Sequence, residues 1–272
     1  MPVSDKVRLA FFDFACCEGC QLTVLGIGEP LLELLQHVEV VTWREAASEQ
    51  SDRYDVAIVE GSLIKDSDLP RLLAIREQAR TLIALGSCAC LGGPHVSANA
   101  FDRAELKQLV FGDLAEHFEA GEVRPLSAVV KVDAPIYGCP INPAEFITVM
   151  THVLLGKPYR PPNLAVCYEC KMNQYECVYD RGQICLGPVT RCGCNAICTS
   201  KGHRCFGCRG LMEEANVYAA RDVLEEHGYT IEEIIAKFQI YSQRAAAVKD
   251  MARPGAGREP KGPEPWRFRS NI

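Results

Sequence analysis

Nine of the 15 cysteines fall between Cys167 and Cys208, and no other feature of the sequence restricts the fold as strongly. Their spacings are C-x2-C-x6-C-x7-C and C-x3-C-x6-C-x2-C, with Cys192 between the two groups. The groups are Cys167, Cys170, Cys177 and Cys185, then Cys194, Cys198, Cys205 and Cys208. Because a [4Fe-4S] cluster takes four thiolates and a C-x2-C pair supplies two from one turn, this segment predicts two such clusters.

Other kinds of site also use many cysteines. Disulfides accumulate in oxidising compartments and small secreted domains, and this chain has neither feature. A redox C-x-x-C pair would stand alone and not among nine cysteines. Structural zinc sites would use the same C-x2-C pairs with four sulfur ligands, so this segment by itself leaves zinc open.

Length and charge restrict the remaining possibilities. The 272 residues suffice for one good domain and an appendage, and 48% of them are hydrophobic, as in proteins that bury a core. A formal charge of -6 argues against a phosphate-binding surface, so we expect no nucleic-acid partner. We find neither a signal-peptide pattern nor an apolar run of roughly 18 residues that would span a membrane. We therefore expect a soluble, cytoplasmic protein.

Short apolar runs alternate with helical patterns in the first half of the chain. We predict strands at residues 7–14, 38–43, 55–60, 81–85 and 128–132. Helices are predicted at 21–36, interrupted near Pro30, and at 68–80, 104–119 and 143–155. Asn142 should cap the last of these helices, with Pro143 in its first turn. This alternation predicts an α/β fold with a doubly wound parallel sheet.

Further cysteines follow the first, fourth and fifth predicted strands. In an open parallel sheet these loops meet at the carboxyl edge, where such folds bind ligands. A third [4Fe-4S] cluster therefore fits there, with Cys17, Cys20, Cys88 and Cys139 as its ligands. The alternative is that Cys88, Cys90 and Cys139 are ordinary buried thiols. No GxGxxG pattern follows the first strand, so we expect no dinucleotide cofactor.

We divide the chain into three parts. Residues 1–155 form the sheet domain, and residues 156–210, which begin with a proline-rich linker, form a small irregular iron–sulfur module. Residues 211–272 contain predicted helices at 211–226 and 230–249, then a tail from 253 that is an extended arm or disordered.

Several segments carry a resemblance to a known family: Cys17-Glu18-Gly19-Cys20, Glu60-Gly61-Ser62, Gly86-Ser87-Cys88, Gly138-Cys139-Pro140, Gly187-Pro188-Val189-Thr190 and Gly202-His203-Arg204-Cys205-Phe206-Gly207-Cys208. They resemble the small, electron-transferring subunit of [NiFe] hydrogenases, and the first domain is also similar to the 20 kDa-type subunit of respiratory complex I. The resemblance implies a flavodoxin-like domain that holds a proximal cluster, then a module that holds medial and distal clusters.

We name the three groups of cysteines by the clusters that this resemblance implies. The proximal set is Cys17, Cys20, Cys88 and Cys139. The medial set is Cys194, Cys198, Cys205 and Cys208. The distal set is Cys167, Cys170, Cys177 and Cys185. These twelve leave Cys16, Cys90 and Cys192 without a ligand role, and the resemblance favours iron–sulfur clusters over zinc.

Three features depart from many relatives. Cys167 stands where they often have a histidine ligand, Cys198 stands where they often have proline, and no twin-arginine signal precedes the first strand. In all three features the chain resembles the cytoplasmic multisubunit hydrogenases. Those enzymes couple hydrogen oxidation or formation to a nicotinamide, to F420, or to a heterodisulfide or ferredoxin system.

The resemblance implies an electron relay with no catalytic side chain of its own. The nickel–iron site would lie on a large partner subunit, because this chain lacks the paired C-x-x-C motifs of that subunit. Electrons would pass through three [4Fe-4S] clusters to or from a further iron–sulfur or flavin subunit. The alternative is the electron-transfer subunit of a complex I-like or other non-hydrogenase redox complex.

Overall fold

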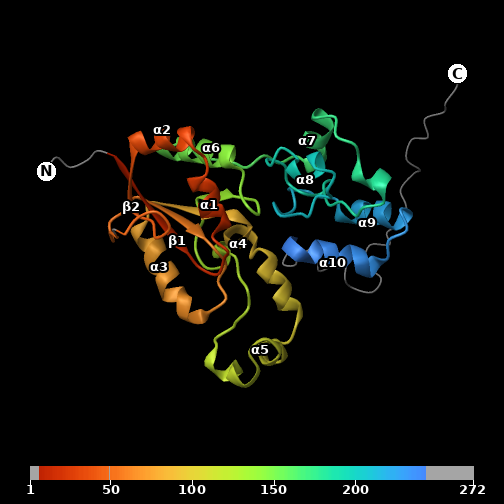
Figure 1. The fold of residues 1–272 in the computed structure, drawn as a ribbon, viewed down its shortest axis with the longest axis horizontal. Helices are drawn as coiled ribbons and strands as arrows, with labels where there is room; N and C mark the ends of the chain where they lie inside the picture. Colours follow the sequence, from red (N-terminus) through yellow and green to blue (C-terminus); the bar gives the residue numbers. More distant parts are fainter. Residues whose placement is uncertain (1–5, 49, 243–272) are drawn as a thin grey trace.

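A five-stranded parallel sheet in the order β2-β1-β3-β4-β5 forms the centre of the first domain (Figure 1). The computed structural model describes residues 6–48 and 50–242. Its strands are β1 (Val7–Asp13), β2 (Val38–Thr42), β3 (Val56–Glu60), β4 (Thr81–Leu85) and β5 (Ala134–Ile136). This strand order is that of flavodoxin-like sheets, which bind ligands near the carboxyl ends of β1 and β3. The predicted fold class is confirmed.

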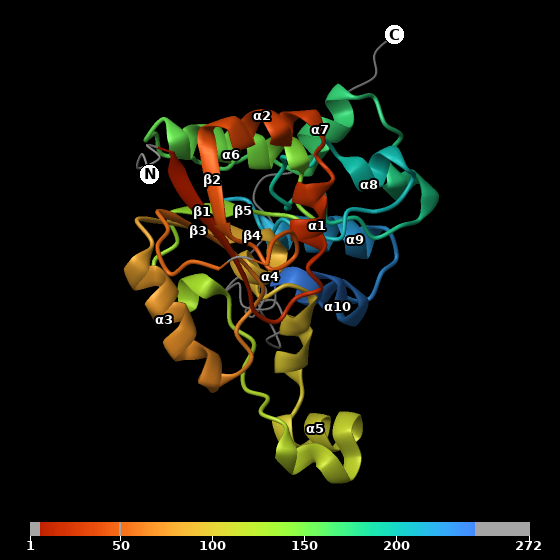
Figure 2. The same ribbon diagram turned by 60° about the vertical axis from the view of Figure 1, so that its left-hand side comes forward.

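Helices cover both faces of the sheet, as Figure 2 shows. One face packs on α1 (Gly19–Leu25), α2 (Glu29–His37) and α6 (Pro143–Leu154). The other packs on α3 (Leu69–Gln78) and α4 (Gly86–Leu91). Both cores are apolar because alternate residues of the buried strands point to opposite faces. The predicted interruption is confirmed, since α1 ends at Leu25 and Pro30 lies in the first turn of α2.

Asn142 caps α6 as predicted. Its side-chain oxygen accepts a hydrogen bond from the Ala144 backbone N–H at 3.0 Å, and Pro143 is the first residue of the helix. The cap fixes where α6 begins, directly after the loop that carries Cys139.

The predicted fifth strand at residues 128–132 is wrong. The chain makes a 3₁₀ turn at Leu126–Ala128 and pairs with β4 only from Ala134. Leu126 and Val130 are buried in the core between the sheet and helices α3 and α4, so this apolar run packs against that face and forms no strand. The strand follows Asp133, whose carboxylate accepts the Leu82 backbone N–H at 2.9 Å.

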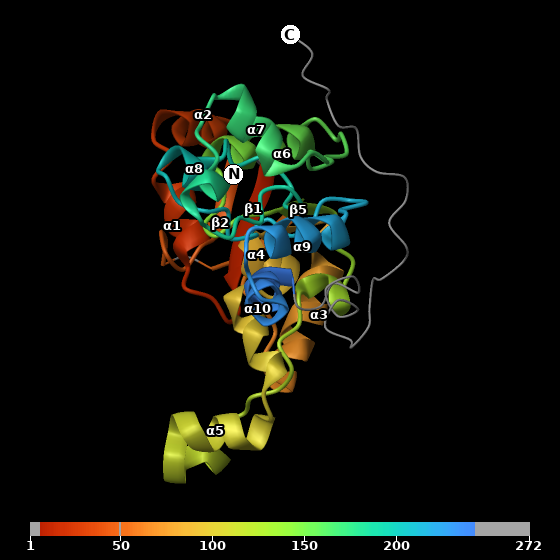
Figure 3. The same ribbon diagram turned by 90° about the vertical axis from the view of Figure 1, so that its right-hand side faces the viewer.

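The predicted helix at 104–119 is also wrong over its second half. Helix α5 (Arg103–Phe111) ends before Gly112, whose φ is 55°, and the 3₁₀ segment Gly112–His117 follows. Together they form an arm that projects from the rest of the chain in all three views (Figures 1 to 3).

The module and the C-terminal helices pack beside the sheet domain (Figure 3). The remaining helices are α7 (Val166–Met172), α8 (Ile197–Ser200), α9 (Val217–Glu226) and α10 (Ile231–Ser242). Helix α9 begins six residues later than predicted because Leu211 first pairs with Thr190. Residues 243–249 of the last predicted helix and the tail from 253 lie outside the described residues. Among those described, no helix is long and apolar enough to cross a membrane.

Candidate metal centres

The four thiols of the proximal set meet at the carboxyl edge of the sheet. Burial is the main cause that raises the pKa of Cys88 to about 12. The thiols of Cys139 and Cys17 contribute to this rise, so both lie close to Cys88. Burial also raises the pKa of Cys20, and Cys88 contributes to that rise. Cys20 and Cys88 are buried, whereas Cys17 and Cys139 are exposed.

Glu60, at the end of β3, holds the start of α1 in place. Glu60 is only 2% exposed, and its carboxylate accepts hydrogen bonds from the backbone N–H groups of Cys20 at 3.1 Å and Gln21 at 3.0 Å. Burial raises the pKa of Glu60. The sequence contains the signal for this role, an acidic residue at the end of a buried strand, although Glu60 was predicted only as part of a family motif and not as an anchor of α1.

Tyr241 is a second residue that sequence reasoning missed. It lies on α10, which packs on α4 and on the 3₁₀ segment Pro94–Ala100 of the first domain. Burial is the main cause that raises its pKa, and a hydrogen bond to the Cys139 thiol is the next. The last described helix therefore reaches the proximal set. A contact over 102 positions of sequence has no local signal.

The distal set forms a second group in the module. Cys167 and Cys170 lie on α7, Cys177 precedes the 3₁₀ segment Val178–Arg181, and Cys185 follows it. The pKa of Cys167 is raised to about 12, mainly by burial, and its three partners in the set contribute to this rise. All four thiols of the set are therefore close together.

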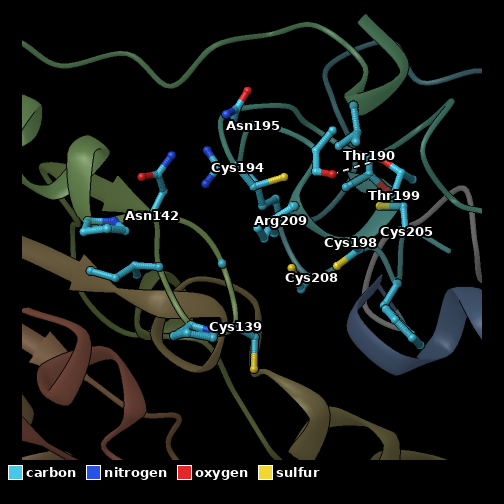
Figure 4. A pocket seen from close by; sticks show the side chains of 18 of the residues that line it. Cys139, Asn142, Thr190, Cys194, Asn195, Cys198, Thr199, Cys205, Cys208 and Arg209 are labelled. Carbon is cyan, nitrogen blue, oxygen red and sulfur yellow. Dashed lines mark hydrogen bonds between the residues drawn. The ribbon is translucent and has the colours of Figure 1, made fainter. Parts of the chain in front are cut away.

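The medial set lines a cavity of about 550 Å³ between α6 and α8. Figure 4 shows the sulfur atoms of Cys194, Cys198, Cys205 and Cys208 facing one space, while the sulfur of Cys139 points away from it. The pKa of Cys208 is raised to about 12, mainly by burial, and Cys194 and Cys198 contribute to this rise. Pro140 and Phe206 are among the apolar residues that close the cavity.

Backbone N–H groups connect the medial set to the other two. The Cys139 N–H donates to the Cys208 thiol, which lowers the pKa that burial raises. The Cys205 N–H donates to the Cys185 sulfur at 3.3 Å. The three sets therefore form a series in which the medial set is in contact with both neighbours.

A buried ion pair fixes the module to the first domain. Arg209 and Glu145 make two hydrogen bonds, at 2.6 and 2.9 Å, and their side chains are 1% and 7% exposed. The guanidinium also donates to the carbonyl oxygens of Cys192 at 2.7 Å and Tyr137 at 2.6 Å. The Tyr159 hydroxyl donates to the Glu145 carboxylate at 2.6 Å. Arg209 directly follows Cys208 and lines the medial cavity. The ion pair therefore helps to fix the position of Cys208.

The three unassigned cysteines differ in their surroundings. Cys16 raises the pKa of Cys88 and thus lies beside the proximal set. The Cys90 thiol points to the carbonyl oxygens of Ala84 and Ile136, at 3.5 and 3.6 Å. Cys192 is buried next to Arg209. The side chain of His203, which the count of ligands does not require, is exposed.

Space is kept free beside some of these sulfur atoms. A Cβ at Gly86, whose φ is +80°, would lie 2.4 Å from the sulfur of Cys20. A Cβ at Gly187 would lie 3.3 and 3.4 Å from the sulfurs of Cys167 and Cys185. Across residues 6–48 and 50–242, no three His, Cys, Asp or Glu side chains come close enough to hold one metal ion. Four thiols around an open space fit a group of several metal atoms, such as an iron–sulfur cluster.

The first domain matches a known family. Residues 17–153 fit the family model described as NADH ubiquinone oxidoreductase, 20 Kd subunit. The matched segment contains all four thiols of the proximal set and Glu60.

Similar proteins extend over most of the chain. The delta subunit of sulfhydrogenase 2 from Pyrococcus furiosus is 36% identical over 222 residues, which cover 81% of this chain and 93% of that subunit. A subunit of the F420-non-reducing hydrogenase vhu from Methanococcus voltae is 30% identical over 257 residues, which cover 80% of this chain and 90% of that subunit. A chain in the crystal structure of an NAD+-reducing [NiFe]-hydrogenase in the H2-reduced state is 27% identical. It superposes with a TM-score of 0.51 over 57% of this chain and 96% of that chain.

Proposed function

Because this chain belongs to the family of hydrogenase small subunits, with a first domain of the NADH ubiquinone oxidoreductase 20 Kd subunit type, we propose that it relays electrons. The relay runs between the nickel–iron site of a large partner subunit and a further iron–sulfur or flavin subunit. The observation that carries this proposal is the unbroken series of three thiol sets, with N–H···S contacts at both junctions.

Each thiol set would hold one [4Fe-4S] cluster. Bound iron–sulfur clusters supply reversible one-electron transfer, and hydrogen bonds to their sulfurs help to set the potential. The chain provides such donors: the Ala196 and Ile197 N–H groups reach the Cys194 sulfur, and the Gly207 N–H reaches that of Cys205. A hydrogen bond donated to a ligand sulfur stabilises its negative charge, so these donors favour the reduced state of the cluster.

The two ends of the series are suited to different partners. At the proximal end, Cys17 and Cys139 are exposed, and Leu22 of α1, the helix that contains Cys20, is 56% exposed, so a large subunit would cover this edge. At the distal end, α7 exposes Tyr168 and Met172 next to its two cysteines, where the further redox subunit would bind. The cytoplasmic location expected from the sequence stays a prediction.

Metal analysis of the native complex tests this function. A tagged chain, isolated anaerobically from its natural host, should be brown and should copurify with a large chain that carries nickel. Its own iron content should be about 12 atoms, four for each cluster. Iron without nickel would favour the complex I-like alternative, and a colourless protein with zinc would contradict both.

Replacement of Cys198 tests the composition of the medial cluster. Cys198→Pro removes one of four thiolates, and proline falls in the first turn of α8, where its missing N–H costs little. The variant should hold a [3Fe-4S] cluster with a higher potential and transfer electrons more slowly. Electron paramagnetic resonance (EPR) of the oxidised variant should show a new signal near the free-electron g value.

Cys192→Ala is the control, because Cys192 is buried nearby but belongs to no set. It should retain the wild-type spectrum. If the anaerobic wild type already shows the new signal at full intensity, Cys198 is not a ligand and Cys192 takes its place as the candidate.

A further inference from the structure

Glu169 lies between the two distal cysteines of α7, but its carboxylate binds the loop that carries a medial cysteine. One oxygen accepts the Gly193 N–H at 2.8 Å, and the other accepts the Ala196 N–H at 3.1 Å. The second oxygen also lies 3.8 Å from the sulfur of Cys194, within reach of its S–H. One side chain thus spans two thiol sets.

The loop that Glu169 holds has an unfavourable backbone. Gly193, Asn195 and Ala196 have φ values of 113°, 55° and 48°, and two of these residues carry a Cβ that disfavours this region. A turn of this kind can direct several backbone N–H groups toward one anion. The Glu169 carboxylate occupies that position, so it stabilises a conformation that the loop does not favour by itself.

A second contact reinforces the first. Asn173, which ends α7, donates its side-chain N–H to the Asn195 side-chain oxygen at 3.0 Å and to the Glu169 backbone oxygen at 2.9 Å. The Ala196 N–H that Glu169 binds also reaches the Cys194 sulfur. The position of Cys194 therefore depends on α7, the helix that also carries Cys167 and Cys170 of the distal set.

We propose that Glu169 is a positioning residue that makes formation of the medial site depend on the distal site. The inference rests on the proposed function only in that the two sets hold iron–sulfur clusters. With α7 in place, the carboxylate fixes the Cys194 loop and the medial set is complete. The carboxylate also adds negative charge beside Cys194, which disfavours addition of an electron to the medial cluster.

Two variants separate these effects. Glu169→Ala removes both acceptor oxygens, so the loop loses its anchor and the medial cluster should be partly or wholly lost. Glu169→Gln keeps one acceptor oxygen and nearly the same shape but removes the charge. It should retain more medial cluster than Glu169→Ala, and the medial potential should shift to a more positive value.

The measurement uses the intact complex in the Cys198→Pro background, where the medial cluster has its own EPR signal. We expect Glu169→Ala to lower the integrated signal at least twofold and to lower iron per chain, while the [4Fe-4S] signals of the other two sites persist. A redox titration of the same signal gives the potential of Glu169→Gln. Glu176→Gln is the control, because Glu176 precedes Cys177 but pairs with the exposed Arg181.

Two results would overturn the proposal. One is a Glu169→Ala variant with the parent intensity and potential of the medial signal. The other is equal loss of the distal signals, which would mean that Glu169 supports α7 alone. Failure of the proposed function has a different signature, because the Cys198→Pro parent would then lack the signal before Glu169 is changed.

Discussion

Replacing Cys139 with alanine is expected to abolish hydrogen-dependent reduction of an external acceptor by the complex. Cys139 is one of the two exposed thiols of the proximal set, and its backbone N–H also contacts Cys208 of the medial set. Alanine keeps that N–H and removes only the thiol, and with it the Tyr241 contact. Because electrons would enter the proposed relay at the proximal site, acceptor reduction should fall to the background rate, while nickel stays in the large subunit.

Cys90→Ala is the matched control for this variant. Cys90 lies in the same domain, and its thiol contacts only carbonyl oxygens among its described hydrogen bonds. It should leave acceptor reduction close to wild type. If Cys139→Ala retains both electron transfer and full iron content, Cys16, which lies beside the same set, becomes the ligand.

Replacing Arg209 with methionine is expected to destabilise the chain by about 3 to 5 kcal/mol, the usual cost of removing one partner of a buried ion pair. The loss leaves the Glu145 carboxylate, which is 7% exposed, without its cation. It also leaves the Cys192 and Tyr137 carbonyls without a donor. Anaerobic thermal unfolding of the complex should show a midpoint well below that of the wild type.

The double variant Arg209→Met/Glu145→Leu should recover part of that loss, because it leaves no unpaired charge in the interior. Arg44→Met is the surface control: Arg44 pairs with Asp13 and Glu18 but is 62% exposed, so its loss should change the midpoint little. An Arg209→Met midpoint equal to that of Arg44→Met would show that the buried pair does not support the fold.

Local patterns predicted most of the fold because a buried strand or helix places its apolar residues at a regular spacing, which can be recognised in the sequence. Strands β1 to β4 lie where apolar runs indicated them, and α6 begins at its predicted cap. The fifth strand was missed for the same reason: Leu126 and Val130 are as apolar as a strand, but they are buried in the core below the sheet. An apolar run shows that residues are buried but does not show against which element.

The candidate sites divide in a similar way. Cysteine spacing and the order of strands predicted three groups among the twelve thiols. The structure places the members of each group together. Their role as ligands stays a prediction. The residues that hold these groups in place had no such signal. Glu145 and Arg209 are 64 positions apart, and Glu169 reaches a loop 24 positions away. Such pairs form only when distant elements meet.

The Arg209–Glu145 pair also limits how this chain can be recombined with its relatives. The guanidinium comes from the module, whereas Glu145 comes from α6 and Tyr159 from the linker. A chimaera joined at residue 156 would take Arg209 from one parent and Glu145 from the other. Unless the first-domain parent supplies a carboxylate at that point of α6, the fusion buries an unpaired cation at the junction. A successful exchange must therefore transfer the acidic residue of α6 together with the module.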